Sequence, residues 1–257
     1  MIALETRSVN KSFGSLAAAQ DVSLAFETGL RYAIIGPNGA GKTTYFNLLA
    51  GNLRPDSGAI LFAGRDVTRL DVTSRAKIGI ARSFQRNNLF SDFTVRDNLM
   101  LACALRAGTT RVFWRPMRHT ASTAAEAEEI AARVGLTDVL GTTVRQLSYG
   151  SQRQLEVGLA LACRPQVLLL DEPTSGMSPE ETAHMHKLIS AIPRSITVIV
   201  IEHDMDIVLD IADRIIVLDY GHVLEQGTSA EIRASAIVRQ RYLGEPAAAD
   251  FGRGVRP

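Results

Sequence analysis

The chain has 257 residues and a formal net charge of +1, and 46% of its residues are hydrophobic. This length and composition suit one large globular domain, or one domain with a subdomain. The near-neutral charge argues against a general nucleic-acid binder. The longest apolar run, residues 196–201, is too short to span a membrane, and Cys103 and Cys163 follow no metal or redox spacing. We therefore expect a soluble protein of a reducing compartment, which would need a membrane-spanning partner for any work at a membrane.

The N-terminal part of the sequence predicts β-structure. Apolar residues alternate with polar or small ones over residues 21–26, which is typical of a half-buried strand. Residues 10–15 look like a turn, and a second turn at 54–58 precedes a predicted strand at 59–63. We expect these segments to form a mainly antiparallel layer beside the glycine-rich loop that lies between them.

That loop follows a predicted strand at 30–35 and precedes a predicted helix that starts at Thr44 and runs to residue 50. It fits the phosphate-loop pattern G-x-x-x-x-G-K-[ST] with Gly36, Pro37, Asn38, Gly39, Ala40, Gly41, Lys42 and Thr43. Glycines let backbone N–H groups curl around a phosphate, and the helix N-terminus adds free N–H groups and its dipole. Lys42 would supply a positive charge for the outer phosphates, and Thr43 a hydroxyl ligand for Mg²⁺.

An ordinary glycine-rich turn is the alternative interpretation of residues 36–43. Average glycine usage gives odds on the order of one in a hundred for a chance match in a chain of this length. The strand and helix on either side favour a nucleotide site. The motif alone does not identify the nucleotide or the process that its hydrolysis drives.

The middle of the chain is helical by period and alanine content, with predicted helices at 94–107, 122–134 and about 148–163. We interpret residues 87–163 as a helical subdomain. The segment at 108–120 mixes basic and aromatic residues, which would fit contact with a membrane surface or a partner. A solvated loop between helices is the interpretation we favour for it.

The last part returns to alternating strands and helices. Residues 167–170 and 196–201 are uninterrupted apolar strands with a predicted helix at 179–192 between them, which indicates a parallel sheet covered on both faces. A short helix ending at residue 212 and strands at 214–219 and 222–225 are expected to follow.

Asp171 and Glu172 come directly after the first of these apolar strands. Ligands of a parallel sheet bind outside the carboxyl ends of its strands, where the phosphate loop also lies. One carboxylate there can hold Mg²⁺ through water, and a second can deprotonate the attacking water, a role worth roughly 10²–10⁴-fold. A helix-capping acid pair is the alternative, but beside a phosphate loop the functional interpretation is favoured.

Weaker signals mark further positions. Gln85 follows a strand-like run at 78–84, where its amide could ligate Mg²⁺ or position water. His203 follows the strand at 196–201; a lone histidine is more often structural, but its place suits donation to a γ-phosphate. Ser148 is a good N-cap for the third helix. This second helix N-terminus also suits phosphate, but it belongs to the subdomain, so one subunit need not bring it to its own phosphate loop.

Together these residues resemble the ATP-binding-cassette (ABC) ATPases over nearly the whole chain. The order of motifs is that family's: Phe13, the phosphate loop, Gln85, the signature at 147–152, the apolar strand with Asp171 and Glu172, the loop at 175–178, and His203. The resemblance implies an α/β fold with a P-loop NTPase core and a mainly parallel sheet, an antiparallel β-subdomain and an inserted helical subdomain. It implies one cassette over residues 1–244, with a frayed tail at 245–257.

The resemblance also implies a mechanism. Two subunits would pair head to tail, so that ATP on one phosphate loop is covered by Ser148, Tyr149 and Gly150 of the other. Phe13 would stack on adenine, Glu172 would be the general base, and His203 would contact the γ-phosphate. Thr43, Gln85 and Asp171 would serve Mg²⁺. Closure would move attached transmembrane permease subunits, whose coupling helices would dock at residues 85–98.

Several segments narrow the subfamily. Tyr149 and Ser151 depart from the common signature LSGGQ, and Ser178 stands where the family often has Asp. Residues 147–150, 88–99, 201–205 and 242–245 look like those of the ATPase subunits of branched-chain (hydrophobic) amino-acid importers. Lipopolysaccharide-export ATPases are relatives with similar loops.

We therefore expect an importer ATPase for branched-chain amino acids or similar small amides or acids, peripheral on the cytoplasmic face of the inner membrane. Its partners would be permease subunits, a second ATPase of the same or another kind, and indirectly a periplasmic binding protein. A non-transport ABC machine of DNA repair or ribosomes is the rival, but the chain has no long coiled-coil insertion or second cassette. A small-molecule phosphotransferase would leave the signature helix unexplained.

Overall fold

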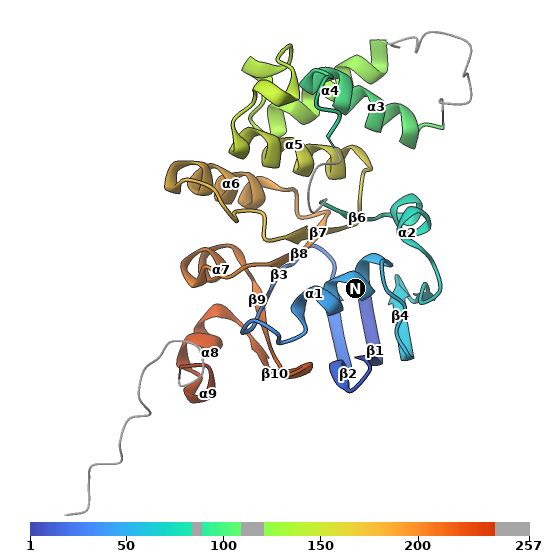
Figure 1. Ribbon diagram of the computed structural model, residues 1–257, viewed down its shortest axis with the longest axis vertical. Coiled ribbons are helices and arrows are strands. Elements are labelled where there is room, and N and C mark those ends of the chain that lie inside the picture. Colours follow the sequence, from blue (N-terminus) through green and yellow to red (C-terminus); the bar gives the residue numbers. More distant parts are fainter. Residues whose placement is uncertain (84–88, 109–120, 240–257) are drawn as a thin grey trace, which may run out of the picture.

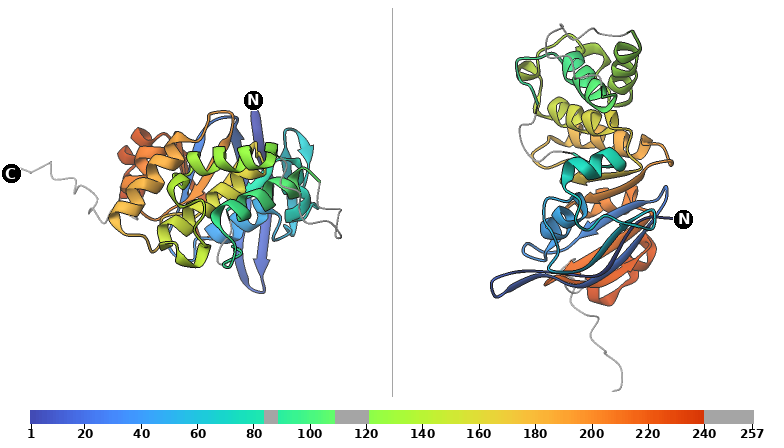
Figure 2. Two further views of the ribbon diagram at one scale, coloured as in Figure 1. Left: turned by 90° about the horizontal axis from the view of Figure 1, so that it is seen from above. Right: turned by 90° about the vertical axis from the view of Figure 1, so that its right-hand side faces the viewer.

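The computed structural model describes residues 1–83, 89–108 and 121–239. Helices α3, α4 and α5 gather at one end of the molecule, away from the antiparallel strands β1 and β2 (Figures 1 and 2). The parallel sheet lies between these two parts. None of the helices in the described ranges combines the length and apolar character that crossing a membrane requires.

The central sheet has the strand order β10-β9-β3-β8-β7-β6, parallel throughout except for the antiparallel pair β9–β10. Its strands are β3 (Arg31–Ile35), β6 (Ile80–Arg82), β7 (Val167–Asp171), β8 (Thr197–Ile201), β9 (Arg214–Asp219) and β10 (His222–Gly227). Every residue of β3, β7 and β8 is buried, as continuous apolar runs require. The expected parallel sheet is confirmed.

A second, antiparallel sheet has the order β2-β1-β4-β5, which confirms the expected β-layer. Its strands are β1 (Ile2–Phe13), β2 (Leu16–Glu27), β4 (Ser57–Phe62) and β5 (Arg65–Asp66). The turn expected at 10–15 was wrong for most of its length, since β1 continues to Phe13. Lys11 pairs with Ala19 across the hairpin, and its Nζ lies 2.6 Å from Asp56 Oδ1. These long-range partners outweigh the turn-like local sequence.

Helix α1 (Lys42–Ala50) is enclosed between the two sheets. Tyr45, Phe46 and Leu49 belong to a core cluster with residues of β1, β2 and one face of the parallel sheet. Helix α2 (Val72–Ile78), which the sequence analysis did not predict, supplies the fully buried Arg75. Its Nη1 donates to the carbonyls of Leu48 and Leu49, each at 2.6 Å, and so caps the end of α1.

Helices pack on the opposite face of the parallel sheet. Helix α5 (Tyr149–Ala162) contacts β6 and β7, and α3 (Val95–Arg106) and α4 (Ala121–Arg133) pack on α5 at the end of the molecule (Figure 1). The remaining helices are α6 (Pro179–Ala191), α7 (Met205–Ile211) and the short α8 (Ser229–Ala234) and α9 (Ala236–Val238). The first three lie within 1–2 residues of their expected bounds, and Glu126 of α4 binds Arg106 of α3 through two bonds of 2.6 and 2.7 Å. The α/β fold class with an inserted helical subdomain is confirmed.

Candidate nucleotide site

The phosphate loop runs from the end of β3 to the start of α1, and the surrounding backbone determines where it needs glycine. Gly39 and Gly41 have left-handed backbones, with φ of 82° and 96°. A Cβ on Gly41 would lie 2.1 Å from the carbonyl oxygen of Ala18, so β2 packs directly against the loop. On the other side, the N–H of Gly221 donates to the carbonyl of Ala40 at 2.9 Å. The loop is therefore held between two segments distant in sequence.

The N-terminus of α1 has the character of an anion site. Its N-cap, Gly41, makes no side-chain capping bond. Pro37, Asn38 and Gly39 of the loop are exposed, as is Thr43, while Thr44 is half-buried. The first N–H groups of a helix have no intrahelical partner, so these can serve a phosphate.

Lys42 extends back along the loop. Only 6% of it is exposed, and its Nζ donates to the carbonyls of Gly36 and of Pro37, the latter at 2.9 Å. Burial lowers the pKa of Lys42, and the negative charge of Glu172 opposes that change. The ammonium group is thus held inside the loop, within the electrostatic reach of Glu172.

Glu172 and His203 meet at the carboxyl edge of the sheet. They follow the adjacent parallel strands β7 and β8, and Glu172 Oε1 lies 2.5 Å from His203 Nε2. Glu172 has a left-handed backbone with φ of 44°, which is uncommon for a residue with a side chain and typical of functional sites. Both side chains are partly exposed. The structure therefore brings together two residues that the sequence analysis placed at this edge separately.

Glu202, which was not among the predicted site residues, holds the loop around this pair. Its Oε1 accepts from the Thr174 hydroxyl at 2.7 Å and from the Thr174 N–H at 3.2 Å. Its Oε2 accepts from the N–H of His203 at 3.2 Å. Burial raises the pKa of Glu202, while these hydrogen bonds oppose the rise. The position of Glu202 between a buried strand and His203 is the sequence feature that could have identified it as a site residue.

Arg82, at the end of β6, is the second residue that the sequence analysis missed. Its Nη2 lies 2.6 Å from Asp171 Oδ2, and 10% and 1% of the two side chains are exposed. Its Nη1 donates to Asn47 of α1 at 2.6 Å and to Asn52 at 2.9 Å. Arg82 thus joins the carboxylate of β7 to the helix that follows the phosphate loop.

The other oxygen of Asp171, Oδ1, is buried and makes no hydrogen bond to any described residue. Burial raises the pKa of Asp171, and Arg82 opposes that rise. A buried carboxylate oxygen without a donor is a suitable acceptor for a hydrated cation, and the exposed Thr43 hydroxyl could supply a second oxygen ligand. These residues fit a magnesium site.

Phe13 and Gln85 are the two remaining predicted site residues that precede the signature. Phe13 ends β1 with 47% of the residue exposed, and the Nζ of Lys11 lies 5.6 Å from its ring centroid. An exposed aromatic ring is suited to stacking. Gln85 lies outside the described residues, as do most of the segment expected to be a solvated loop at 108–120 and the tail at 245–257.

The signature residues begin α5. Ser148 is its N-cap and accepts from the N–H of Ser151 at 3.2 Å. Tyr149 is 47% exposed; the guanidinium of Arg153 lies 5.4 Å from its ring centroid, and a Cβ on Gly176 would lie 3.4 Å from the ring. The departure from the common signature at Tyr149 is thus accommodated by neighbouring contacts.

Helices α5 and α1 pack on opposite faces of the parallel sheet. Leu168 and Leu170 of β7 share a core cluster with α5, while Val167 and Leu169 share the other cluster with α1. This alternation follows from the pleat of a strand. The parallel sheet therefore separates the signature helix α5 from the phosphate-loop helix α1.

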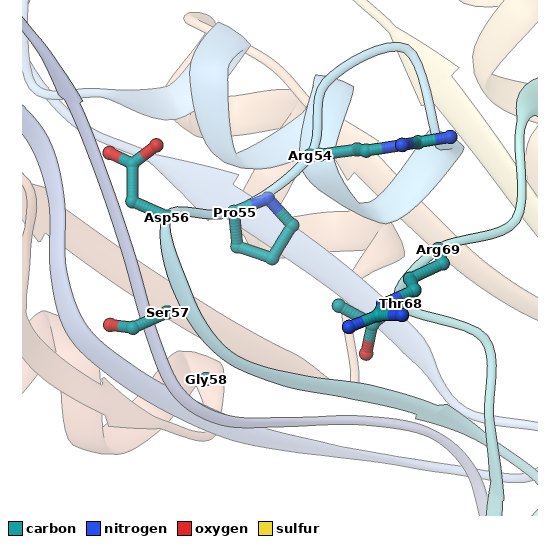
Figure 3. A pocket seen from close by; sticks show the side chains of 7 residues that line it. All are labelled: Arg54, Pro55, Asp56, Ser57, Gly58, Thr68 and Arg69. Atoms are coloured by element: carbon teal, nitrogen blue, oxygen red, sulfur yellow. The ribbon is translucent and has the colours of Figure 1, made fainter.

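A separate pocket opens on the antiparallel sheet (Figure 3). It is lined by Arg54, Pro55, Asp56, Ser57, Gly58, Thr68 and Arg69. Asp56 is already engaged, because its Oδ2 accepts from the N–H of Ser12 at 2.7 Å. The pocket shares no residue with the predicted nucleotide site.

The fold and the site define an ATPase with a phosphate loop, in which carboxylates lie at the carboxyl end of the parallel strand β7 and a helical block is inserted. The model of the ABC transporter family matches residues 19–175. Two relatives are branched-chain amino-acid transport ATP-binding proteins. BraF of Pseudomonas aeruginosa is 37% identical over 94% of this chain and 98% of its own, and LivG of Escherichia coli K12 is 37% identical over 91% and 94%.

A solved structure of similar fold is the ADP conformation of MJ1267, an ATP-binding cassette of an ABC transporter. It has a TM-score of 0.84 and 28% identity, and the match covers 95% of this chain and 100% of that one. The chain therefore belongs to the ABC transporter family, and it is one of that family's ATPases.

Proposed function

We propose that this chain is the ATP-hydrolysing subunit of an importer for branched-chain amino acids or similar small amides or acids. The observation that carries the proposal is 37% identity to BraF and LivG over more than nine-tenths of each chain. A methionine import ATP-binding protein of P. aeruginosa is 35% identical over 89% of the chain, but only 68% of its own length matches. The full-length match favours the branched-chain class.

For nucleotide binding, Lys42 and the free N–H groups at the start of α1 would hold the phosphates, and Phe13 would stack on adenine. The loop residues Gly36 to Gly41 would supply further backbone donors. Mg²⁺, held by Thr43, Gln85 and Asp171, would neutralise negative charge on the phosphates. The buried, undonated oxygen of Asp171 supports this assignment.

For hydrolysis, Glu172 would accept the proton of the attacking water, with Gln85 helping to position that water. The contact of 2.5 Å between His203 and Glu172 supports a joint role, in which His203 orients the carboxylate and then contacts the γ-phosphate. The left-handed backbone of Glu172 supports the same conclusion, since it fixes the direction of the side chain.

A second subunit would complete each site with its Ser148, Tyr149 and Gly150. The placement of α1 and α5 on opposite faces of the sheet supports this arrangement. Closure of two subunits over ATP would then be the mechanical step. We propose that residues 1–244 form one cassette, that residues 87–163 are its helical subdomain and that residues 245–257 are a tail.

The partners in this proposal are transmembrane permease subunits, contacting residues 85–98, and a second ATPase of the same or another kind. A periplasmic binding protein would act indirectly, and the chain would work at the cytoplasmic face of the inner membrane. The near-neutral net charge supports the expectation that no nucleic acid is bound.

Uptake of radiolabelled leucine by cells lacking this gene tests the proposal. Wild-type protein should restore uptake, whereas Lys42→Ala and Ser148→Arg should not, although both accumulate. Co-purification of all three proteins with the same membrane subunits would show that assembly is intact. Normal leucine uptake without the gene, or full activity of Ser148→Arg, would count against the substrate class or the two-subunit site respectively.

A further inference from the structure

The first turn of α6 is joined to the first turn of α5 through one carboxylate, that of Glu181. Its Oε2 accepts from the N–H of Ser178 at 3.1 Å and closes the capping box of α6. Its Oε1 accepts from the hydroxyl of Ser148 and from the N–H of Gly150, each at 3.0 Å. One side chain therefore caps two helices.

Gly150 makes this contact possible. A Cβ at this position would lie 2.5 Å from Oε1 and 2.6 Å from Cδ of Glu181, so any larger residue would displace the carboxylate. The hydrogen bonds from Ser178, Gly150 and Ser148 hold the pKa of Glu181 below its ordinary value. The carboxylate is therefore an anion, seated against donors that glycine leaves accessible.

The negative charge of Glu181 affects the signature residues Ser148 and Gly150, because both donate hydrogen bonds to it. A helix N-terminus favours a negative group. Here N–H groups at the N-termini of α5 and α6 both donate to the carboxylate of Glu181. A nucleotide phosphate would need the Ser148 hydroxyl and the Gly150 N–H as well. The two anions cannot use the same donors at full strength, because their like charges would be a few ångströms apart.

We propose that Glu181 occupies the signature donors of the free subunit and must release them before they accept a nucleotide phosphate from a second subunit. This inference rests on the two-subunit site of the proposed function. Glu181 is a positioning residue in this scheme: it sets how readily Ser148 and Gly150 become available.

Sedimentation velocity with ATP tests the release step in a Glu172→Gln background, which prevents turnover. Adding Glu181→Gln should lower the protein concentration at half-dimerisation about tenfold, because a neutral amide competes less with phosphate. Glu180→Gln removes the same charge from the same helical turn and should change nothing. Unchanged or weaker dimerisation with Glu181→Gln would overturn the inference. If the Glu172→Gln protein forms no ATP-dependent dimer at all, the two-subunit site is at fault.

Thermal unfolding of the nucleotide-free protein decides the role of Glu181 without a dimer. Glu181→Ala should lower Tm, and inorganic phosphate should recover part of that loss when compared with chloride at equal ionic strength. The phosphate loop binds phosphate in every variant, so Glu180→Ala gives the baseline. A capping residue with no anion role would lower Tm without this phosphate-specific recovery, and that result would contradict the inference.

Discussion

The sequence predicts a phosphate site at the N-terminus of α1 and another at the N-terminus of α5, but the two have different surroundings in the structure. The N-cap of α1 is Gly41, which has no side-chain capping bond. The N-terminus of α5 is capped by its own Ser148 and by Glu181 of α6. The first N-terminus has no anionic cap, and the second has its donors occupied by an internal anion.

The difference shows that the two halves of the proposed ATP site are prepared unequally. The phosphate loop is fixed by backbone contacts with Ala18 and Gly221, and the N-terminus of α1 has no side-chain cap to displace. The signature must exchange one anion for another. ATP is therefore expected to bind the free subunit through α1 first, and the contact with α5 is expected to follow.

The largest effect should come from a change of the proposed general base, Glu172, which lies on the α1 side of the ATP site. Glu172→Gln should bind ATP and slow hydrolysis by roughly 10²–10⁴-fold, because an amide cannot accept the proton of water. Phosphate release measures the rate, and a fluorescent ATP analogue measures the affinity. Glu180→Gln is the matched control. Turnover at the wild-type rate would show that another group is the base.

Arg82→Met should have the next largest effect, because it leaves the carboxylate of Asp171 buried without the guanidinium group of Arg82. We expect a loss of about 3 kcal/mol in the free energy of unfolding, measured with urea. Combining it with Asp171→Asn should lose less than the sum of the two changes, since the unpaired charge is then removed. Additive losses would mean that the pair is not the cause.

Lys42→Ala should weaken ATP binding by about 10–100-fold through loss of a charged donor to phosphate. Ser148→Arg should leave the affinity of the isolated subunit unchanged, which sharpens the contrast between α1 and α5. Titration with a fluorescent ATP analogue measures both, with the exposed Lys77→Ala as the control. An equal loss in Ser148→Arg would mean that α5 contributes to binding within one subunit.

The smallest effect is the pH dependence of the capping contact at α5. The folded pKa of Glu181 is below its ordinary value of 4.5, so its contribution to stability is present above pH 4.5 and lost as pH falls through the lowered pKa. The stability difference between wild type and Glu181→Gln should therefore shrink on acidification below 4.5. Urea titrations across this range measure it; a difference independent of pH would exclude the ionised contact.

Features that depend on a local sequence pattern could be predicted without the structure. Residues 36–43 predicted the phosphate loop because its glycines are dictated by backbone shape. The apolar runs of β7 and β8 predicted buried parallel strands, and the acids Asp171 and Glu172 at the end of β7 were placed at the functional edge. Whether Gln85 joins them lies outside the described residues.

The side chains that reach these features from distant parts of the chain could be identified only from the packing of the folded protein. Arg75 caps α1 from a helix that the sequence analysis did not predict, and Arg82 reaches Asp171, 89 positions along the chain. Glu181 reads locally as an ordinary capping-box acid of α6, and its second set of donors comes from α5. Hydrogen bonds and charges act through space, so such partners depend on how the helices pack against the sheet and not on the neighbouring residues in the chain.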